Sequence, residues 1–233
     1  MTNNINPLDI KMRLVRSFMR RNGRMSDLQR AAMSEIRPKY QLEITDKKKD
    51  WREVFGCDAP VFIEIGFGNG QALLDLAQNN PQYNYVGIEV YTVGIASLLL
   101  GIERLNLTNI RVFSIDAVDV FKHAIDASSL AGVMLYFPDP WPKKRHHKRR
   151  LVQKDFVDLV SSRLKKEGVW HMATDWAHYA EHMMAVMSAR QDFLNPAGNA
   201  SFYSGSIARP LTRFETKGLE QGHVTHELLF VKC

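Results

Sequence analysis

An α/β fold with a doubly wound, mostly parallel sheet and an antiparallel pair of strands at one edge is the architecture that this sequence predicts. From Pro60 onward, short apolar runs typical of buried strands alternate with segments of helical spacing, and the connections between them are short. Such alternation indicates parallel β-α-β units. The last two predicted strands are joined without a long helix, which favours antiparallel pairing at the edge.

The first half of the predicted sheet starts at Val61–Ile65, an apolar run that ends in glycine-rich sequence and therefore predicts a buried strand. A helix is predicted at Gln71–Gln78, and Pro81 follows its end. A second strand, a long helix with apolar residues on several sides and a third strand are predicted next, at Tyr85–Val90, Thr92–Leu105 and Ile110–Ile115.

The second half continues this alternation. Val118–Ala127 predicts a weak helix, and Val133–Phe137 predicts a fourth strand that Pro138 stops. Apolar residues at helical spacing predict a helix over Leu151–Leu164, and Gly168 breaks it before the fifth strand. The fifth strand, a further helix, the last strand and the expected partner of that last strand are predicted at Val169–Ala173, Trp176–Arg190, Glu227–Lys232 and near Ser201–Tyr203.

The net charge of +6 on the 233 residues is unevenly distributed. Residues 1–50 hold 12 Lys or Arg and 6 Asp or Glu, whereas residues 51–233 hold 19 of each. Within the second part, Lys143–Arg150 contains 6 basic residues and no acid. We therefore predict a basic N-terminal arm (1–50) and one domain (51–233). The two basic clusters favour a polyanionic partner, and a solvated charged face is the alternative.

Several classes of protein are excluded by what the sequence lacks. Cys57 and Cys233 are its 2 cysteines, which argues against a disulfide framework or a thiolate metal site. The histidines show no convincing metal-ligand spacing. No apolar run approaches the roughly 20 residues of a membrane helix, and the N-terminus lacks the apolar core of a signal peptide. We expect a soluble, cytoplasmic monomer or homodimer without a metal.

The first predicted strand leads into a glycine-rich turn that contains Gly66, Gly68 and Gly70. Ligands of open α/β sheets bind outside the carboxyl ends of the strands, and glycines there allow a ligand to approach the backbone closely. A dinucleotide fingerprint would need a small residue where Gln71 stands. Glu64, two residues before the turn, would repel a pyrophosphate. The motif therefore favours a cationic or amine-bearing ligand over a dinucleotide.

The next two strands also end in acids. Glu89 follows the glycine turn by about 20 residues, a spacing at which an acid accepts hydrogen bonds from ribose hydroxyls. Asp116 is placed to accept from an adenine amine or to approach the ribose, and a helix N-cap is the alternative role. Three acids behind a turn that disfavours phosphate indicate a nucleoside that is not a phosphate ester. S-adenosylmethionine has these properties: an adenosine, a sulfonium and an ammonium group.

The fourth strand ends in a loop where three prolines surround Asp139 and Trp141. The prolines make this loop rigid, which favours a functional position for the aspartate. The alternative is a plain connection with Trp141 packed into the core. The basic run Lys143–Arg150 follows at once, and beside the expected cofactor site it is typical of a surface that binds phosphates.

Together these motifs resemble the bacterial tRNA (guanine-N7)-methyltransferase family, whose members have the Rossmann-like fold of class I methyltransferases. The resemblance extends from about Arg20 to the C-terminus, although Pro142 stands where the family often has histidine. It rests on segments in the right order and spacing, namely Glu64–Gly70, Phe137–Lys143 with Arg145–Arg150 after it, Thr174–Trp176 and Thr212–Glu215.

The resemblance implies methyl transfer from S-adenosylmethionine to N7 of a guanine in the variable loop of tRNA. The expected cofactor-binding residues are Glu64, Gly66, Gly68, Gly70, Glu89, Asp116 and Asp139. The expected substrate-binding residues are Lys143, Asp175, Thr212, Arg213, Phe214 and Glu215. The expected RNA-binding residues are Arg145, His146, His147, Lys148, Arg149 and Arg150. Without the resemblance, Asp175 is equally suited to cap a helix, and Arg213 with Glu215 to form a surface ion pair.

The implied reaction needs positioning more than proton transfer. Guanine N7 has a lone pair and no proton, so no base is required, and catalysis rests on orientation and electrostatics. A carboxylate that accepts from guanine N1–H and N2–H would select guanine and stabilise the growing positive charge. Asp139 is the expected catalytic residue, with Asp175 and then Glu215 as further candidates. Neither cysteine follows a strand end, which argues against a cysteine-dependent mechanism.

Two other functions remain open at this point. The first is a class I methyltransferase that acts on a protein or a small molecule, for which the basic run would be superfluous. The second is an RNA-binding or chaperone protein with a vestigial nucleoside pocket, which would not bind S-adenosylmethionine.

Overall fold

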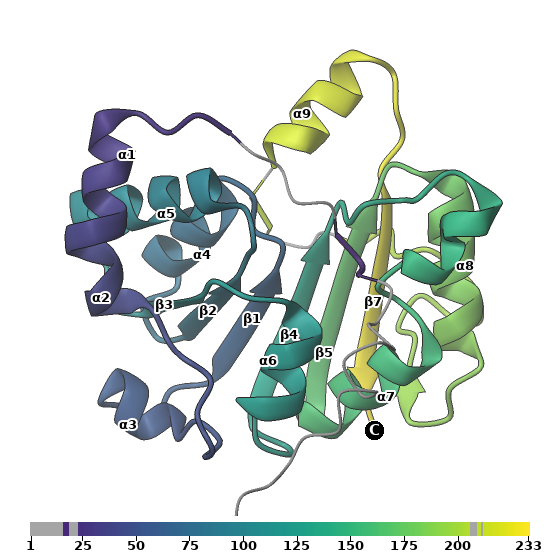
Figure 1. Ribbon diagram of the computed structural model, residues 1–233. Helices are drawn as coiled ribbons and strands as arrows, with labels where there is room; N and C mark the ends of the chain where they lie inside the picture. The colour runs from purple at the N-terminus through teal and green to yellow at the C-terminus, as the bar shows by residue number, and fades with distance from the viewer. Residues whose placement is uncertain (1–15, 19–22, 206–208, 211) are drawn as a thin grey trace, which may run out of the picture.

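The computed structural model describes residues 16–18, 23–205, 209–210 and 212–233. Within them, seven strands form one sheet in the order β3-β2-β1-β4-β5-β7-β6 (Figure 1). The pairs among β1 to β5 are parallel, whereas β7 is antiparallel to both β5 and β6. The predicted doubly wound sheet with an antiparallel edge is therefore confirmed.

Most of the strands lie close to their predicted positions. The observed strands are β1 (Val61–Ile65), β2 (Asn84–Ile88), β3 (Ile110–Phe113), β4 (Leu130–Tyr136), β5 (Leu164–Thr174), β6 (Phe193–Leu194) and β7 (His226–Lys232). β1 lies between β2 and β4, so that Ile63 pairs with Val86 on one side and Val133 on the other. All five residues of β2 are buried, as expected for a central strand covered on both faces.

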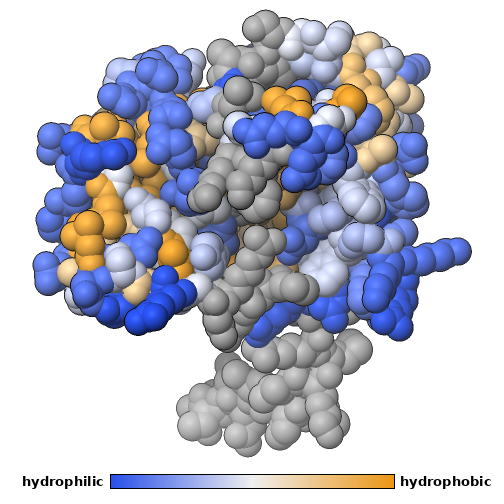
Figure 2. All heavy atoms as spheres, turned by 90° about the horizontal axis from the view of Figure 1, so that it is seen from above, coloured by the Kyte–Doolittle hydropathy of each residue, from blue (hydrophilic) through white to orange (hydrophobic). Residues whose placement is uncertain are grey.

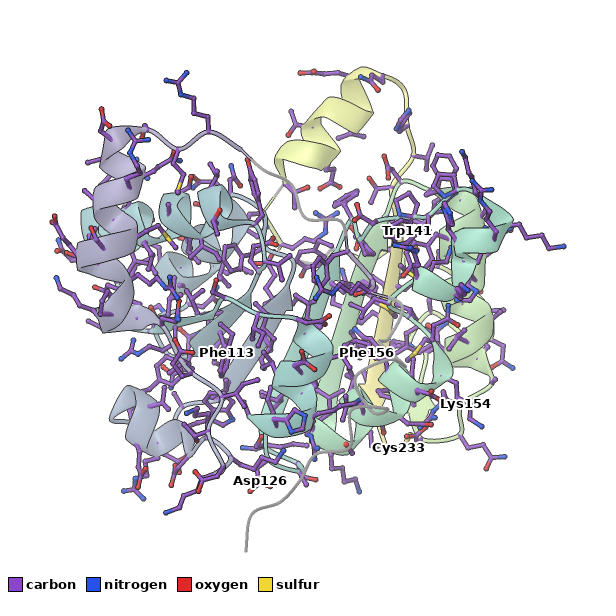
Figure 3. All side chains as sticks on the ribbon, in the orientation of Figure 1. Phe113, Asp126, Trp141, Lys154, Phe156 and Cys233 are labelled. Atoms are coloured by element: carbon purple, nitrogen blue, oxygen red, sulfur yellow. The ribbon has the colours of Figure 1, made fainter. Side chains whose placement is uncertain are left out.

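Helices cover both faces of the sheet (Figure 1). The observed helices are α1 (Asp27–Ala31), the π-helix η1 (Ala32–Ile36), α2 (Arg37–Tyr40), α3 (Trp51–Phe55), α4 (Gln71–Asn79), α5 (Thr92–Leu105), α6 (Ala117–His123), the 3₁₀-helix η2 (Lys144–Arg149), α7 (Lys154–Arg163), α8 (Ala177–Ser188) and α9 (Arg213–Glu220). One apolar core joins α4 and α5 to the sheet, and a second joins α6, α7 and α8 to it. Phe113 and Phe156, labelled in Figure 3, belong to the second core.

The described part of residues 1–50 packs against the domain. The Gln29 side chain donates to Ser97 Oγ at 3.0 Å, and Tyr40 donates to Glu103 at 2.8 Å, so α1 and α2 lie along α5. The backbone N–H of Leu42 then donates to Val112 O of β3 at 2.8 Å. These contacts cover the edge of the sheet at β3. Residues 1–15 and 19–22 of the predicted basic arm lie outside the described residues.

The partner of the last strand differs from the prediction. β7 pairs with β6 at Phe193 and Leu194, not with a strand near Ser201–Tyr203, where one backbone hydrogen bond joins Tyr203 N to Glu227 O. The side chain of Asn195 accepts from Ala197 N and donates to Ser201 O, and the resulting turn lies between β6 and Tyr203 along the chain. A strand of two residues is too short to produce a hydrophobic pattern.

The boundary between α7 and β5 also differs. The predicted helix over Leu151–Leu164 starts at Lys154, and β5 begins at Leu164 instead of Val169. A register shift opposite Leu130 and Gly132, together with Glu167 at φ 64°, adds an irregular turn to the start of β5. In the part of the chain that the structure describes, the helices are too short or too polar to cross a membrane.

Candidate functional site

A cavity of about 410 Å³ opens where the carboxyl ends of β1, β2, β3 and β4 meet. Such a place is typical of ligand sites in open α/β sheets. Seven of the expected site residues line it together, and the last of them comes from the far end of the chain: Glu64, Gly66, Gly68, Glu89, Asp116, Asp139 and Thr212. Ser17 and Phe18 also reach the cavity, from the described fragment of the N-terminal arm.

The glycine turn between β1 and α4 is held by Glu89. Gly66 and Gly68 adopt φ values of 75° and 59°, which only glycine adopts without strain. The carboxylate of Glu89 accepts from the backbone of Gly68 at 2.9 Å, Val90 at 2.7 Å and Tyr91 at 3.1 Å. Glu89 therefore fixes the shape of the turn from the end of β2 while its side chain lines the cavity.

Glu64 is a buried acid at the base of the cavity. It is 3 % exposed, and its Oε2 has no hydrogen-bond partner among the described residues. Burial, with the nearby charge of Glu89, raises the pKa of Glu64 to about 8. A buried carboxyl group of this kind is stabilised in its charged form by a cation. The residues present thus fit a ligand that carries positive charge, as predicted from the sequence.

Asp116 has the capping role that the sequence offered, and it also reaches the cavity. Its carboxylate accepts from Val118 N at 2.9 Å and caps α6, and the residue also lines the cavity. Burial raises the pKa of Asp116. The second carboxylate oxygen of a capping aspartate is available to a ligand.

The proline-rich loop after β4 holds Asp139 at the cavity. Phe137 and Trp141, on either side of the Pro-Asp-Pro sequence, have φ values of 50° and 47°. A non-glycine residue in this region is strained, and such residues cluster at functional sites. Trp141 is 8 % exposed, and its Nε1 donates to Ser17 O at 3.1 Å. Figure 3 shows it near the carboxyl ends of the strands, where it packs and anchors the loop.

The basic run after this loop divides into two parts. Lys143, Lys144, Arg145 and Lys148 are exposed, and His146, His147 and Arg149 are half-buried. In the view from above, hydrophilic side chains surround much of this face of the molecule (Figure 2). The guanidinium of Arg149 lies 4.9 Å from the centre of the Trp141 ring, a cation–π contact that supports the loop.

Arg150 differs from the rest of the run. It is 2 % exposed, and its Nε donates to Pro140 O at 2.9 Å, while its guanidinium lies 4.8 Å from the Tyr179 ring centre. A guanidinium enclosed in this way fixes the proline loop and does not face solvent. We therefore leave Arg150 out of the RNA surface proposed below.

Asp175 lies beside α9, after the end of β5. Its Oδ2 is 3.1 Å from Nδ1 of His223, a residue that the sequence did not single out. The Trp176 backbone N–H instead donates to Thr174 Oγ1 at 3.2 Å, so Asp175 does not have the capping role considered from the sequence. Asp175 is not among the residues that line the cavity. It therefore lies on the α9 side of the site.

The segment Thr212–Glu215 begins α9. Thr212 Oγ1 accepts from Glu215 N at 3.1 Å and caps the helix, while Thr212 lines the cavity. Glu215 is buried and pairs with Arg209. The side chains of Arg213 and Phe214 lie outside the described residues. In Figure 1, α9 lies above the carboxyl ends of the strands.

Two further residues were missed by the sequence reasoning. Arg209 stands three positions before the Thr212–Glu215 motif and gave no signal of its own. Gly94, in the first turn of α5, leaves room for the glycine turn, because a Cβ there would lie 1.9 Å from Gly68 O. A glycine inside an otherwise apolar helix was the available signal for Gly94.

The described residues contain no group of three or more His, Cys, Asp or Glu side chains that would hold a metal ion. Cys57 and Cys233 are both free and exposed.

Known proteins resemble this chain in sequence and in fold. A family described as putative methyltransferases matches residues 58–228. A "tRNA (guanine-N(7)-)-methyltransferase" of Vibrio parahaemolyticus is 46% identical over 223 residues, which cover 95% of this chain and 93% of the relative. A protein of the same description from Nitrosospira multiformis is 47% identical over 220 residues, 94% of this chain and 95% of the relative.

Among solved structures, an aminoglycoside resistance methyltransferase has a TM-score of 0.53 at 16% identity, covering 82% of this chain and 95% of its own. The antibiotic-resistance methyltransferase Kmr has a TM-score of 0.53 at 13% identity, covering 81% and 94%. At these identities the likeness concerns the fold alone, and it is the fold of methyltransferases.

Proposed function

The chain belongs to the family of tRNA (guanine-N(7)-)-methyltransferases, and from this premise we propose that it transfers a methyl group from S-adenosylmethionine to N7 of a guanine in the variable loop of tRNA. The observation that carries the proposal is the cavity at the carboxyl ends of the strands, with acids from three strand ends and an unpartnered oxygen on Glu64. An adenosine that carries positive charge fits these groups, whereas a phosphate ester does not.

Each cofactor contact follows from the position of its residue in the cavity. Glu64 would face a cationic group of the methionine part, because a cation stabilises its buried carboxylate. Glu89, at the end of β2, would accept from the ribose hydroxyls, and Asp116 from the adenine amine. Gly66 and Gly68 have no side chain and border open space, so the cofactor would lie against backbone. Bound S-adenosylmethionine would supply an electrophilic methyl group on a sulfonium.

The reaction moves charge without moving a proton. The N7 lone pair of guanine forms the new bond to the methyl carbon, and the electrons of the carbon–sulfur bond pass to sulfur. Sulfur becomes a neutral thioether, and the guanine ring becomes cationic. Residues of this chain therefore act by orienting guanine in line with the methyl group and by stabilising the positive charge.

Asp139 is the residue best placed to do this. It lines the cavity from a loop that prolines and strained neighbours make rigid. A carboxylate there would accept from guanine N1–H and N2–H, which adenine does not offer in that arrangement. Asp175, next to α9, is the second candidate for this contact.

The exposed basic residues after the proline loop would bind the tRNA backbone. Lysine and arginine bind phosphates without regard to sequence and position the RNA, while contacts in the cavity select the base. The proposed surface consists of Lys143, Lys144, Arg145, His146, His147, Lys148 and Arg149. A cytoplasmic location agrees with a tRNA substrate.

Incubation with unmodified tRNA and labelled S-adenosylmethionine, followed by mapping of the product, tests this proposal. We expect one 7-methylguanosine in the variable loop. Label on a protein or small molecule instead would favour the other methyltransferase hypothesis. Absence of S-adenosylmethionine binding in calorimetry would favour a binding protein without catalysis. Either result would contradict the proposal.

A further inference from the structure

Arg209 is a buried arginine between two carboxylates from different elements. Its side chain is 6% exposed. NH1 and NH2 donate to the two oxygens of Glu215, in α9, at 2.5 and 2.6 Å. Nε donates to Oε1 of Glu227, in β7, at 2.8 Å, and NH2 also bonds to that oxygen. The planar guanidinium thus joins the first turn of α9 to β7.

This contact continues toward the cofactor cavity. Glu227 Oε2 lies 2.6 Å from Nε2 of His171, whose Nδ1 lies 2.9 Å from the hydroxyl of Tyr136. Tyr136 lines the cavity, and the guanidinium of Arg209 lies 5.3 Å from its ring centre. One connected set of side chains therefore links β4, β5 and β7 to α9. We call Arg209, Glu215, Glu227, His171 and Tyr136 the α9 anchor.

The charged groups of the α9 anchor stabilise one another. Burial alone would lower the pKa of Arg209, but its bonds to Glu215 and Glu227 raise it overall. Burial alone would raise the pKa of Glu227, and the bonds from His171 and Arg209 lower it overall. Removal of Arg209 would leave the buried carboxylate of Glu215 and the half-buried carboxylate of Glu227 without this cation, which is costly.

The position of the α9 anchor decides what it does. Thr212, which caps α9, lines the cavity, and the other end of α9 lies against Asp175, where a Cβ on Gly218 would be 3.6 Å from Asp175 Oδ2. Helix α9 therefore lies between the cavity and Asp175, the second candidate for guanine binding. Both carboxylate oxygens of Glu215 already accept hydrogen bonds from Arg209, so Glu215 would be a poor acceptor for the N–H groups of guanine.

We propose that Arg209 is a positioning residue that sets α9 over the cavity and so orients the guanine, and that Glu215 acts through Arg209 instead of touching the base. This inference rests on the proposed tRNA methylation. In the Thr212–Glu215 motif, Thr212 then faces the site, and Glu215 fixes the position of α9 through Arg209.

The chain offers a matched control. Arg190 also forms a two-pronged pair with a carboxylate, donating to Asp192 at 2.7 and 2.8 Å, and it bonds to Asp158 as well. It lies near the C-terminus, at the opposite end of the strands from α9. Arg190→Met therefore removes a similar ion pair from a place that should not affect catalysis.

The experiment compares Arg209→Met, Arg209→Lys and Arg190→Met in thermal unfolding, calorimetric binding of S-adenosylmethionine, and steady-state tRNA methylation. Misplacement of the guanine by about 1 Å can cost about 100-fold, so for Arg209→Met we expect kcat to fall about 10- to 100-fold at saturating substrates. The cofactor affinity should stay within about threefold, because the cofactor residues are untouched. Arg209→Lys keeps the charge but not the planar guanidinium, so its kcat should lie between those of Arg209→Met and the original protein.

Arg190→Met should lower the melting temperature and leave kcat near that of the original protein. If the Arg209 variants lose melting temperature alone and retain kcat, the α9 anchor is merely structural and the inference is overturned. Should Arg209→Met fail to fold, Arg209→Lys is judged by the same criterion. An original protein that does not methylate tRNA would contradict the proposed function instead, so the two failures are distinguishable.

A double-mutant cycle tests the role of Glu215. If Glu215 acts through Arg209, Arg209→Met combined with Glu215→Gln should lose no more of kcat than Arg209→Met alone. Losses that multiply would show that Glu215 contributes independently, as a residue that touches the base would, and would overturn this part of the inference.

Discussion

Acidic side chains at the two ends of the sheet are held in different ways. At the amino ends of the parallel strands, Asp192 accepts from Arg190 and Ser161 and lies near Lys232, and its bonds to Arg190 lower its pKa. At the carboxyl ends, Glu64 keeps an oxygen without a partner among the described residues, and burial raises its pKa. The charge of Asp192 is thus neutralised within the protein, whereas Glu64 keeps an oxygen that is open to a ligand.

Strained backbone occurs at both ends of the sheet, because Ser128 and Glu167, beside the amino ends of β4 and β5, also have positive φ values. At the carboxyl end of β4, the strained residues Phe137 and Trp141 lie on either side of Asp139. Strain there accompanies an unpartnered buried acid, and both lower stability and persist where function requires them. The comparison teaches that the functional end of this fold is recognisable by interactions left incomplete. Variants at the two ends of the sheet, or at matched positions of one helix, test this difference.

Asp139→Asn should have the largest effect. Loss of the carboxylate removes stabilisation of the cationic guanine, and a single electrostatic contact of this kind is worth about 100- to 1,000-fold in kcat. Asp158→Asn, at the Arg190 cluster, is the control and should leave kcat unchanged. Measurement of kcat with saturating tRNA and cofactor checks this. Near-normal turnover of Asp139→Asn would remove Asp139 from the site.

Gly94→Ala should weaken cofactor binding by about tenfold or more, because a Cβ 1.9 Å from Gly68 O displaces the glycine turn. Gly101, in the same helix, is the control, since a Cβ there would meet only the flexible side chain of Leu74. Calorimetry with S-adenosylmethionine compares the two variants. Equal losses of affinity would mean that disturbance of α5 in general, and not of the turn, is responsible.

Lys144→Glu with Lys148→Glu should weaken tRNA binding and reduce its dependence on salt. Each phosphate contact adds a little under one unit to the slope of log affinity against log salt, so we expect the slope to fall by about one to two units. Lys165→Glu with Lys166→Glu exchanges an exposed pair near the start of β5 and should change neither quantity. An unchanged slope in the first variant would place the RNA elsewhere.

The pH dependence contributed by Glu64 should be the smallest effect. Between pH 4.5, the ordinary pKa of the group, and pH 8, the folded protein binds a proton that the unfolded chain lacks. Stability of the ligand-free protein from this group therefore falls as pH rises from about 4.5 to 8, and levels off above 8. Thermal unfolding across this range, compared with Glu64→Gln, isolates the contribution.

The affinity for the cofactor should rise with pH, whereas the stability of the ligand-free protein falls. A cation favours ionised Glu64, so binding near pH 7 should release protons, and affinity should rise toward pH 8 until the ammonium of the cofactor loses its own proton at about 7.7–8.0. Calorimetry in buffers of different ionisation enthalpy measures the release. Proton release of equal size in Glu64→Gln would show that Glu64 does not face the cation.

Much of the fold was predictable because apolar runs and their glycine or proline ends are local. Val61–Ile65 was placed correctly, since its apolar residues are followed at once by the glycine turn. The convergence of Glu64, Glu89 and Asp116 was predictable as well, because parallel strands bring their carboxyl ends to one edge. The strand β6 was not predictable, because a strand of two residues shows no hydrophobic pattern.

The arginines show where sequence reasoning reaches its limit. Arg150 stands in a run of exposed cations, and no local pattern reveals that this member alone turns inward onto Pro140 and Tyr179. Arg209 pairs with Glu227, 18 residues away, and that contact depends on how β7 returns along β5. Ion pairs across elements depend on the tertiary fold, so they become visible only in the structure.

The central claim is that guanine N7 attacks a methyl group in the cavity at the carboxyl ends of the strands. It is tested most directly with two tRNAs that differ only at the mapped guanine, one with guanine and one with 7-deazaguanine, where carbon replaces N7. We expect one methyl group per molecule on the first and none on the second, with both bound alike. Methylation of the 7-deazaguanine tRNA to the same extent would contradict the claim.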